Sequence, residues 1–250
     1  KYSMMSKTII LIPSRLSASR LPGKPLLKIN GLPIICHVFK KAKKTNIGQV
    51  VVCAEDKEIV NEVKKIGGEA ILTSSHHKSG SDRIFEGFKK LELKNVDYIL
   101  NLQGDEPNID EKDIINLNNS IMNNNSDLGT LATKIKNESI LSNENIVKVI
   151  LKEKLSERNF PLATNFYRKN LSIKNENIYH HIGIYIYKVS ILERFVNLNQ
   201  TSNEIKYRLE QLRALDNGIK INVALAKSSP IGIDTEEDYL ALKKIMEYKS

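Results

Sequence analysis

Tryptophan is absent from this sequence of 250 residues, and only 6% of the residues are aromatic. A chain so poor in large rings offers few stacking platforms for single-stranded nucleic acid. Cysteine is scarce as well: Cys36 and Cys53 are too few for a disulfide framework, and their spacing is not that of a CxxC motif. We therefore expect two buried thiols in a protein of the reducing cytoplasm.

Long hydrophobic runs are also missing. The longest uninterrupted apolar stretch near the N-terminus, residues 9–12, is far shorter than the roughly 20 residues of a membrane span. With 12 glycines and 7 prolines, the composition excludes collagen-like and low-complexity chains, while 41% apolar residues indicate a globular protein. We expect a single domain over residues 1–250 and no membrane partner.

The common signatures of phosphate-binding loops and zinc sites do not occur. The chain contains neither GxxxxGK[ST] nor GxGxxG, which argues against P-loop and nicotinamide-binding proteins. HExxH is absent, and histidine and cysteine do not cluster at the spacing of zinc ligands. If the protein is an enzyme, its active site must therefore be built from residues outside these motifs.

Positive charge, in contrast, is in excess. Lysine and arginine number 38 against 29 aspartates and glutamates, which gives a net charge of +9. This excess suits an anionic partner: nucleic acid, a membrane surface, or a phosphorylated or carboxylated small molecule. A solvated lysine-rich surface is the simpler explanation, so charge alone does not choose among these.

The first half of the chain alternates between short apolar runs and helical patterns. We predict strands at residues 8–12, 50–54, 70–72 and 98–102, and helices at residues 33–44, 58–66 and 82–93. Strands that are apolar throughout and alternate with helices indicate an α/β fold: a mostly parallel sheet with helices on both faces. Ligands of such sheets bind at the carboxyl ends of the strands.

The second half is less regular. We predict strands at residues 128–135, 146–151, 182–187 and 221–225, and helices at residues 111–119, 204–215 and 235–246. Thr235 is the expected cap of the last helix. The asparagine-rich stretch 116–125 is interpreted as a polar turn or helix end, and the polar segment 152–177 as irregular chain that can serve as a lid.

Three fixed cations follow the first predicted strand. Arg15, Arg20 and Lys24 lie in a loop, residues 13–25, that also carries serine hydroxyl groups. Guanidinium groups bind phosphate oxygens in a forked geometry, and a lysine adds a point charge. The loop is a candidate clamp for a triphosphate, and a basic surface loop is the alternative.

Two aspartates stand at positions typical of metal ligands. Asp105 follows the strand predicted at residues 98–102, and Asp234 immediately precedes the last helix. Paired carboxylates suit Mg²⁺, which proteins hold through one or two carboxylates together with substrate phosphates. Helix capping and turn formation are the alternatives for both residues.

A third polar segment, residues 76–83, joins a short strand to a helix. Its amides, its hydroxyl groups and Arg83 can contact a base or a sugar, whereas capping by Ser81 or Asp82 is the alternative.

Taken together and in order, these segments resemble the motifs of the 3-deoxy-manno-octulosonate cytidylyltransferases. The matching stretches span nearly the whole chain: residues 9–26, ING at 29–31, HKSGSDR at 77–83, NLQGDEP at 101–107, VKV at 147–149, HIGIY at 181–185, EQLR at 210–213 and GIDT at 232–235. Any one motif is weak, but the series in this order is specific.

The resemblance implies an α/β nucleotidyltransferase with a nucleotide-diphospho-sugar transferase-like (Rossmann-like) fold. Enzymes of this family join CTP to the sugar acid 3-deoxy-manno-octulosonate (Kdo), giving CMP-Kdo and pyrophosphate for lipopolysaccharide biosynthesis. It also implies a cytoplasmic, Mg²⁺-dependent homodimer without a nucleic-acid partner, in which residues 152–188 include a lid and a dimerisation region.

The resemblance also assigns roles to individual residues. The implied catalytic residues are Arg15, Lys24 and Asp105, and the implied Mg²⁺ ligands are Asp105 and Asp234. The implied nucleotide contacts are Arg15, Arg20, Lys24, Ser79, Gly80 and Arg83. The implied sugar contacts are Gln103, His181, Tyr185, Glu210 and Gln211.

Two positions depart from the family pattern. Lys78 stands where the family commonly has glutamine, and Leu162 stands where it has an arginine. Either Arg158 or Arg168 substitutes for that arginine, or the sugar acid is held differently.

Two other functions stay open on the residues alone. A nucleotide-sugar glycosyltransferase of similar architecture usually displays a DxD pair, which the DEP sequence at residues 105–107 lacks. A basic nucleic-acid-binding protein would show an affinity for RNA or DNA that falls steeply with salt.

Overall fold

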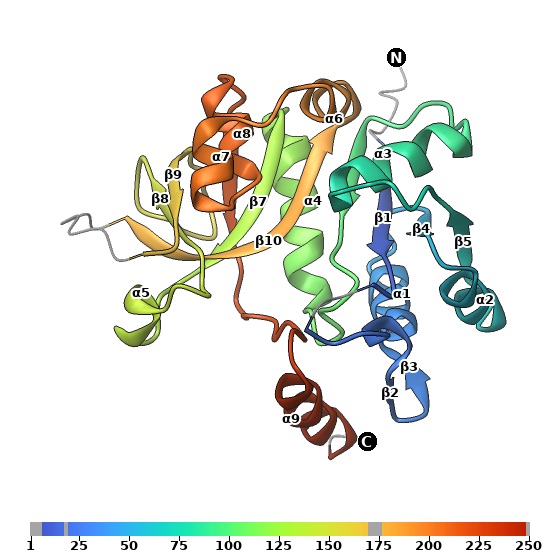
Figure 1. The fold of residues 1–250 in the computed structure, drawn as a ribbon. Coiled ribbons are helices and arrows are strands. Elements are labelled where there is room, and N and C mark those ends of the chain that lie inside the picture. Colours follow the sequence, from blue (N-terminus) through green and yellow to red (C-terminus); the bar gives the residue numbers. More distant parts are fainter. Residues whose placement is uncertain (1–6, 18–19, 170–176, 249–250) are drawn as a thin grey trace. The chain divides into compact units, whose positions relative to one another are not determined.

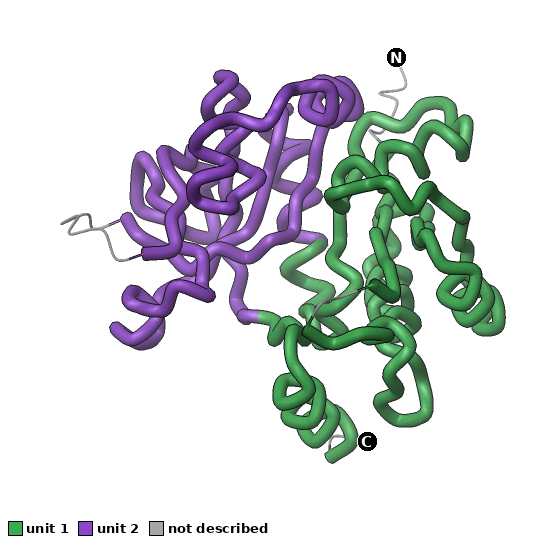
Figure 2. Tube along the Cα trace, in the orientation of Figure 1, with its two compact units in different colours: residues 1–114, 230–250 green, residues 115–229 purple. Residues whose placement is uncertain are grey.

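The computed structural model of the chain describes residues 7–17, 20–169 and 177–248. It divides into two compact units (Figure 2): unit 1 comprises residues 1–114 and 230–250, and unit 2 comprises residues 115–229. The single domain over residues 1–250 stays a prediction. The lid and dimerisation roles of residues 152–188 also stay predictions, and residues 170–176 of that segment lie outside the described residues.

Unit 1 is built on a parallel sheet, of which Figure 1 labels β1, β4 and β5. Its strands are β1 (Thr8–Ser14), β4 (Val50–Ala54), β5 (Glu69–Leu72) and β6 (Tyr98–Asn101), in the order β6-β1-β4-β5. Each neighbouring pair runs parallel. β1 and β4 are buried along almost their whole length, which is why they are apolar on both faces. The predicted parallel α/β arrangement is confirmed.

Three helices connect these strands, α1 (Ile34–Lys44), α2 (Lys57–Lys65) and α3 (Gly80–Leu91). α1 and α2 carry the chain outward from β1 to β4 and β5, so right-handed crossovers place both on one face of the sheet. α3 carries the chain back past β1 to β6, and the same handedness places it on the other face. The direction of winding therefore reverses between β1 and β6, and ligands bind at the carboxyl ends of strands at such a point.

A smaller layer completes unit 1. The short 3₁₀ helix η1 (Lys24–Leu26) precedes the strands β2 (Lys28–Ile29) and β3 (Leu32–Pro33), and α9 (Glu236–Glu247) contacts β2. The buried side chains of this layer are Ile29, Ile34, Ile233 and Leu242. Because Ile233 and Leu242 pack against Ile29 and Ile34, the segment after residue 230 belongs to unit 1.

Unit 2 contains a sheet in which most neighbouring strands are antiparallel. Its strands are β7 (Leu128–Thr133), β8 (Lys148–Leu151), β9 (Ala163–Tyr167), β10 (Ile178–Lys188) and β11 (Ile221–Leu225). β11 runs parallel to β7, whereas β10 is antiparallel to β7 and β8, and β8 is antiparallel to β9. The sequence did not indicate these antiparallel pairs.

The helices that follow α4 in unit 2 are short. The chain enters the unit within α4 (Glu111–Asn124) and continues through α5 (Ser139–Ser142), α6 (Val189–Val196), α7 (Ser202–Tyr207) and α8 (Gln211–Asp216). Across the described part of the chain, no helix has the length and apolar character needed to traverse a bilayer.

Three predictions of local structure are wrong in whole or in part. The asparagine-rich stretch is the end of a helix and not a turn: α4 continues to Asn124, because Ile114, Leu117 and Ile121 repeat at helical spacing and are buried. The segment 152–177 is not irregular throughout, since it contains β9. The helix predicted over residues 204–215 is two helices, because Arg208 adopts a left-handed conformation with φ 55° that ends α7.

Two smaller predictions are confirmed. The Thr235 side chain caps α9 by accepting a hydrogen bond from the Asp238 amide. Cys36 and Cys53 are buried and form no disulfide. Burial raises the pKa of the Cys53 thiol to about 12, which keeps it protonated and unreactive at neutral pH.

Candidate active site

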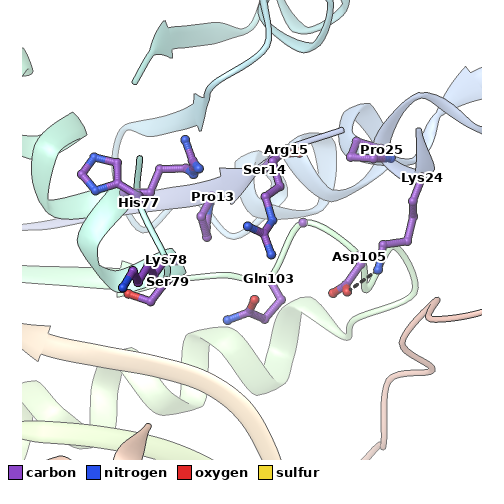
Figure 3. A pocket seen from close by; sticks show the side chains of 13 residues that line it. Pro13, Ser14, Arg15, Lys24, Pro25, His77, Lys78, Ser79, Gln103 and Asp105 are labelled. Atoms are coloured by element: carbon purple, nitrogen blue, oxygen red, sulfur yellow. Dashed lines mark hydrogen bonds and ion pairs between the residues drawn. The ribbon is translucent and has the colours of Figure 1, made fainter. Parts of the chain in front are cut away.

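A pocket of about 280 Å³ lies at the carboxyl ends of β1 and β6, where the winding of the sheet reverses (Figure 3). It is lined by residues 13–15, 24–25, 77–80, 83 and 103–105, all of which belong to unit 1. The predicted site residues Arg15, Lys24, Ser79, Gly80, Arg83, Gln103 and Asp105 are therefore brought together here. Arg20 is exposed and does not line the pocket.

The base of the first loop explains how Arg15 and Lys24 reach one pocket. The Gly23 amide donates a 3.0 Å hydrogen bond to the Leu16 carbonyl, and this closes the loop just inside the two cations. The Leu16 amide donates a 2.8 Å hydrogen bond to Asp56 Oδ2, which ties the loop to the residues after β4. Gly23 has φ 72°, a conformation that glycine adopts without strain.

Lys24 is the point at which the two predicted metal ligands converge. Its Nζ donates hydrogen bonds of 2.9 Å to Asp105 Oδ2 and of 2.6 Å to the Ile233 carbonyl. Asp234 Oδ1 lies 4.0 Å from the same nitrogen. A main-chain hydrogen bond of 3.1 Å, from the Ile233 amide to the Asp105 carbonyl, holds the two segments together. The site thus contains one fixed cation between two carboxylates.

Glu106 is a residue of this site that the sequence analysis did not single out. Its Oε2 is buried and makes no hydrogen bond within the described part of the chain. Burial, with the added repulsion of Asp105 and Asp234, raises the pKa of Glu106 to about 8. The side chain is therefore a neutral acid over most of the physiological pH range. In the sequence, the only indication of this role was that Glu106 directly follows Asp105 in the DEP sequence at residues 105–107.

The donor set fits Mg²⁺ held jointly with a substrate. The described residues contain no group of three or more histidine, cysteine, aspartate or glutamate side chains that could hold a metal ion by themselves. Asp105 and Asp234 provide two carboxylates beside an anion-sized pocket, and Mg²⁺ commonly takes one or two carboxylates and completes its shell with phosphate oxygens and water.

The start of α3 forms the wall that faces the first loop. Ser79 Oγ accepts a 3.2 Å hydrogen bond from the Asp82 amide and donates one of 2.8 Å to Asp82 Oδ2. The cap is therefore Ser79, and the alternative of Ser81 or Asp82 as the cap is wrong. A Cβ on Gly80 would approach Pro13 Cγ to 3.1 Å, so glycine lets α3 begin directly against β1.

Arg83 lines the pocket but is engaged by the protein. Its Nη1 donates hydrogen bonds of 2.7 Å to Thr73 Oγ1 and of 3.0 Å to the Ser74 carbonyl, and its Nη2 is paired with Glu55. The side chain is 3% exposed. In this structure Arg83 holds the loop between β5 and α3, and its nucleotide contact stays a prediction.

The other predicted sugar contacts lie in unit 2. His181 Nε2 lies 3.0 Å from Thr130 Oγ1, and the His181 ring meets Phe166 edge to face at 5.0 Å between ring centroids. Burial, together with the neighbouring His180, lowers the pKa of His181 to about 3, so its imidazole is neutral.

Tyr185 and Glu210 belong to the same part of unit 2 as His181. The rings of Tyr185 and His181 lie 5.6 Å apart. Burial and, to a lesser extent, the charge of Glu210 raise the pKa of Tyr185. Gln211 is the buried first residue of α8. Gln103, in contrast, belongs to unit 1, so the predicted sugar contacts are divided between the units.

Comparisons with known proteins agree with one another. The family model described as "Cytidylyltransferase" matches residues 9–221. The chain is 42% identical over 240 residues to the 3-deoxy-manno-octulosonate cytidylyltransferase of Afipia carboxidovorans, covering 96% of each chain. It is 42% identical over 250 residues to that of Thermodesulfovibrio yellowstonii, covering 96% of this chain and 98% of the relative.

The solved structures give the same picture. A CMP:2-keto-3-deoxy-manno-octonic acid synthetase in complex with CTP superposes with a TM-score of 0.90 at 31% identity, covering 98% of this chain and 100% of the other. A cytidylyltransferase from Leptospira borgpetersenii has a TM-score of 0.65 at 20% identity, over 97% and 87% of the two chains, and shows the likeness of fold alone.

Proposed function

The chain belongs to the 3-deoxy-manno-octulosonate cytidylyltransferases, and we propose that it transfers CMP from CTP to Kdo, with release of pyrophosphate, in lipopolysaccharide biosynthesis. The observation that carries the proposal is the convergence of Arg15, Lys24 and Asp105 in one pocket at the carboxyl ends of β1 and β6. Such a pocket offers two cations for a triphosphate and the carboxylate of Asp105, with Asp234 beside Lys24, for the ion that accompanies it.

The binding of CTP follows from the charges of the pocket. Arg15 lines the pocket and is exposed, and a guanidinium group binds phosphate oxygens in a forked geometry. Lys24 is held in place by Asp105 and the Ile233 carbonyl, so its charge is positioned before the nucleotide arrives. The amides at the start of α3 add the positive end of a helix dipole to the opposite wall.

The reaction is an in-line displacement at the α-phosphorus. The anomeric hydroxyl oxygen of Kdo forms the new bond to phosphorus and loses its proton to water, and the bond to the bridging oxygen of the leaving pyrophosphate breaks. Negative charge builds on the phosphoryl oxygens, and Arg15 and Lys24 stabilise it where it builds. Positioning and electrostatics therefore supply most of the acceleration.

Asp105 and Asp234 would hold Mg²⁺, which when bound neutralises phosphate charge and fixes the geometry of the leaving group. Lys24 keeps these two carboxylates at one place in the free protein. The neutral Glu106 beside them adds no third negative charge, which limits the repulsion that the acid pair must overcome.

We assign the sugar acid to Gln103, His181, Tyr185, Glu210 and Gln211, as the family resemblance implies. The neutral imidazole of His181 and the protonated phenol of Tyr185 suit a polyhydroxy substrate, because both offer hydrogen bonds without a charge that must be desolvated. A cytoplasmic homodimer completes the proposal.

The decisive experiment measures pyrophosphate release from CTP with Kdo, with sialic acid and without sugar, each with and without Mg²⁺. We expect release only with Kdo and Mg²⁺. Release with sialic acid in place of Kdo would change the substrate assignment. The absence of release, with consumption of a preformed nucleotide sugar or with salt-sensitive binding of RNA, would replace the proposal by a glycosyltransferase or a nucleic-acid-binding protein.

A further inference from the structure

His77 and Glu86 form a pair at the edge of the pocket that the proposed reaction does not use. His77 lines the pocket in the loop between β5 and α3, and Glu86 lies two turns into α3. His77 Nε2 is in direct hydrogen-bond contact with Glu86 Oε2. Both side chains are about one-fifth exposed, at 22% and 21%. The pair is therefore partly shielded from water.

Glu86 is itself held on three sides. The Ser74 amide donates to Glu86 Oε2 at 3.0 Å, and Lys90 Nζ lies 2.6 Å from Glu86 Oε1. Burial acts to raise the pKa of Glu86, but the hydrogen bonds from Lys90, His77 and Ser74 outweigh it and lower that pKa to about 2. Glu86 is therefore an anion at neutral pH and can only accept hydrogen bonds.

The state of Glu86 decides the tautomer of His77. Because a carboxylate accepts, the imidazole nitrogen that faces it, Nε2, carries the hydrogen. In the neutral ring the other nitrogen, Nδ1, then has a lone pair and acts as an acceptor. Within the described residues Nδ1 of His77 makes no hydrogen bond. The neutral ring therefore presents an acceptor on a residue that lines the pocket.

The neighbouring side chains cannot play that role. Lys78 can only donate hydrogen bonds, and so can Arg83, whose guanidinium group is already engaged. Ser79 Oγ is occupied by Asp82. In Figure 3, His77, Lys78 and Ser79 lie at the opposite end of the pocket from Lys24 and Asp105. A nucleotide with its phosphates at Lys24 would place its base at this end.

We propose that Glu86 is a positioning residue that holds His77 with Nδ1 as an acceptor, and that this acceptor selects the amino group of cytosine over the carbonyl group of uracil. The proposal rests on the proposed use of CTP. It assigns the choice of base to a side-chain pair of which only one member, His77, lines the pocket. An exocyclic amino group donates to Nδ1, whereas a carbonyl at the same place leaves two lone pairs facing each other.

The test compares CTP and UTP in the wild type and in two variants, His77→Gln and Glu86→Gln. Pyrophosphate release with Kdo gives kcat/KM for each nucleotide. The glutamine amide at position 86 can donate to Nε2 and so removes the preference for hydrogen on that nitrogen. We expect Glu86→Gln to lower the preference for CTP at least about tenfold, mainly by raising KM for CTP.

His77→Asn distinguishes selection from folding. Asparagine keeps an acceptor near the place of Nδ1 without needing Glu86, so it should retain most of the preference for CTP, whereas His77→Gln should lose it. Adding Glu86→Gln to His77→Asn should then change the preference by less than about twofold, because coupled residues are not additive. Additive effects would mean that Glu86 does not act through His77.

A spectroscopic readout keeps the proposal testable if Glu86→Gln folds poorly. The ¹⁵N chemical shifts of the His77 ring in the wild-type protein report which nitrogen carries hydrogen. Hydrogen on Nδ1 at neutral pH, whether in the neutral ring or in the imidazolium, would overturn the proposal. Lys90→Met is the matched control, because it removes an ion pair of Glu86 but leaves the contact with His77. It should cost stability while leaving the CTP preference within about twofold.

The two proposals fail in different ways. A wild-type protein that releases no pyrophosphate from CTP and Kdo would contradict the proposed function. An active wild type whose Glu86→Gln variant keeps the full preference for CTP would leave the function standing and overturn the role of Glu86.

Discussion

Lys24 Nζ lies 2.9 Å from Asp105 Oδ2, in a pocket whose other features suit an anion. The lysine side chain is only 14% exposed, so its position is set by the protein before any ligand binds. A preorganised charge needs no rearrangement at the moment of reaction. In the proposed function, this pair would therefore link the binding of phosphate to the binding of Mg²⁺.

Asp105→Asn should lower kcat by about 10²–10³-fold, the scale for loss of one preorganised electrostatic group. The amide keeps the shape of the side chain but loses its charge toward Lys24 and toward the proposed Mg²⁺. Pyrophosphate release from CTP and Kdo measures the effect. Asp110→Asn is the control and should remain near wild type, because this half-buried residue just before α4 lies outside the pocket, and asparagine can still accept the hydrogen bond from the Lys112 amide. Normal turnover by Asp105→Asn would remove the residue from the site.

Lys24→Ala should weaken CTP binding by about tenfold or more, because it removes a fixed cation from the triphosphate clamp. Isothermal titration with CTP measures the change in Kd, and circular dichroism reports whether the fold persists. Lys28→Ala, a few residues along the chain at an exposed position, removes the same charge outside the pocket. Equal losses in the two variants would show that only net charge matters.

Glu106 should make the protein less stable as pH rises. The pKa of this acid is raised to about 8 in the folded protein against an ordinary 4.5, so its contribution is complete below pH 4.5 and is lost as pH climbs through 8. The wild type should lose up to about 1.4 kcal/mol per pH unit relative to Glu106→Gln in that window. Urea unfolding of both proteins at pH 5, 6.5 and 8 measures the slope, and parallel pH profiles would contradict it.

His181 should make the protein less stable as pH falls. Its folded-state pKa of about 3 lies below the ordinary 6.5, so its contribution to stability is present above pH 6.5 and is lost as pH falls toward 3. The Thr130 hydroxyl lies within hydrogen-bond distance of the ring, and His181→Gln can keep a hydrogen bond there. This variant should be less stable than the wild type at pH 7 but lose less on acidification. Acid unfolding followed by circular dichroism distinguishes the two curves.

Gly87→Ala should destabilise the protein by about 1–3 kcal/mol, the usual cost of overpacking a core. A Cβ at this position would lie 2.4 Å from Cys53 Sγ, where α3 crosses β4. The gain in helix propensity is smaller than this cost. Thermal unfolding measures it, and adding Cys53→Ala should restore much of the loss by making room. An unchanged Tm in the single variant would mean that the helix can shift away from the strand.

The sequence predicted the parts of the fold that depend on local apolar spacing. The bounds of β4 and β11 match the expected strands, because both are short, buried and apolar throughout. The sequence-based prediction was wrong where tertiary contacts determine the secondary structure. Asparagine side chains that usually favour turns lie within α4, where Ile114 and Leu117 are buried. Arg208 ends a helix in the left-handed conformation, which no local sequence pattern predicted.

For the site, the sequence supplied the residue types but not their partners. Arg15 and Lys24 could be placed in one loop from their spacing, but the hydrogen bond between Leu16 and Gly23 that closes it could not. The burial of Glu106 and the contact of His77 with Glu86 depend on how neighbouring elements pack, and side-chain identity alone does not reveal them.

The second carboxylate near Lys24 is supplied by the segment that returns to unit 1 after residue 230. A growing polypeptide that has emerged only as far as unit 2 already possesses the cationic loop and Asp105, but its acid pair is incomplete. If Asp234 holds Mg²⁺ as proposed, synthesis must pass this residue before the protein can bind a metal-bound nucleotide, so catalytic competence should appear late in translation and all at once.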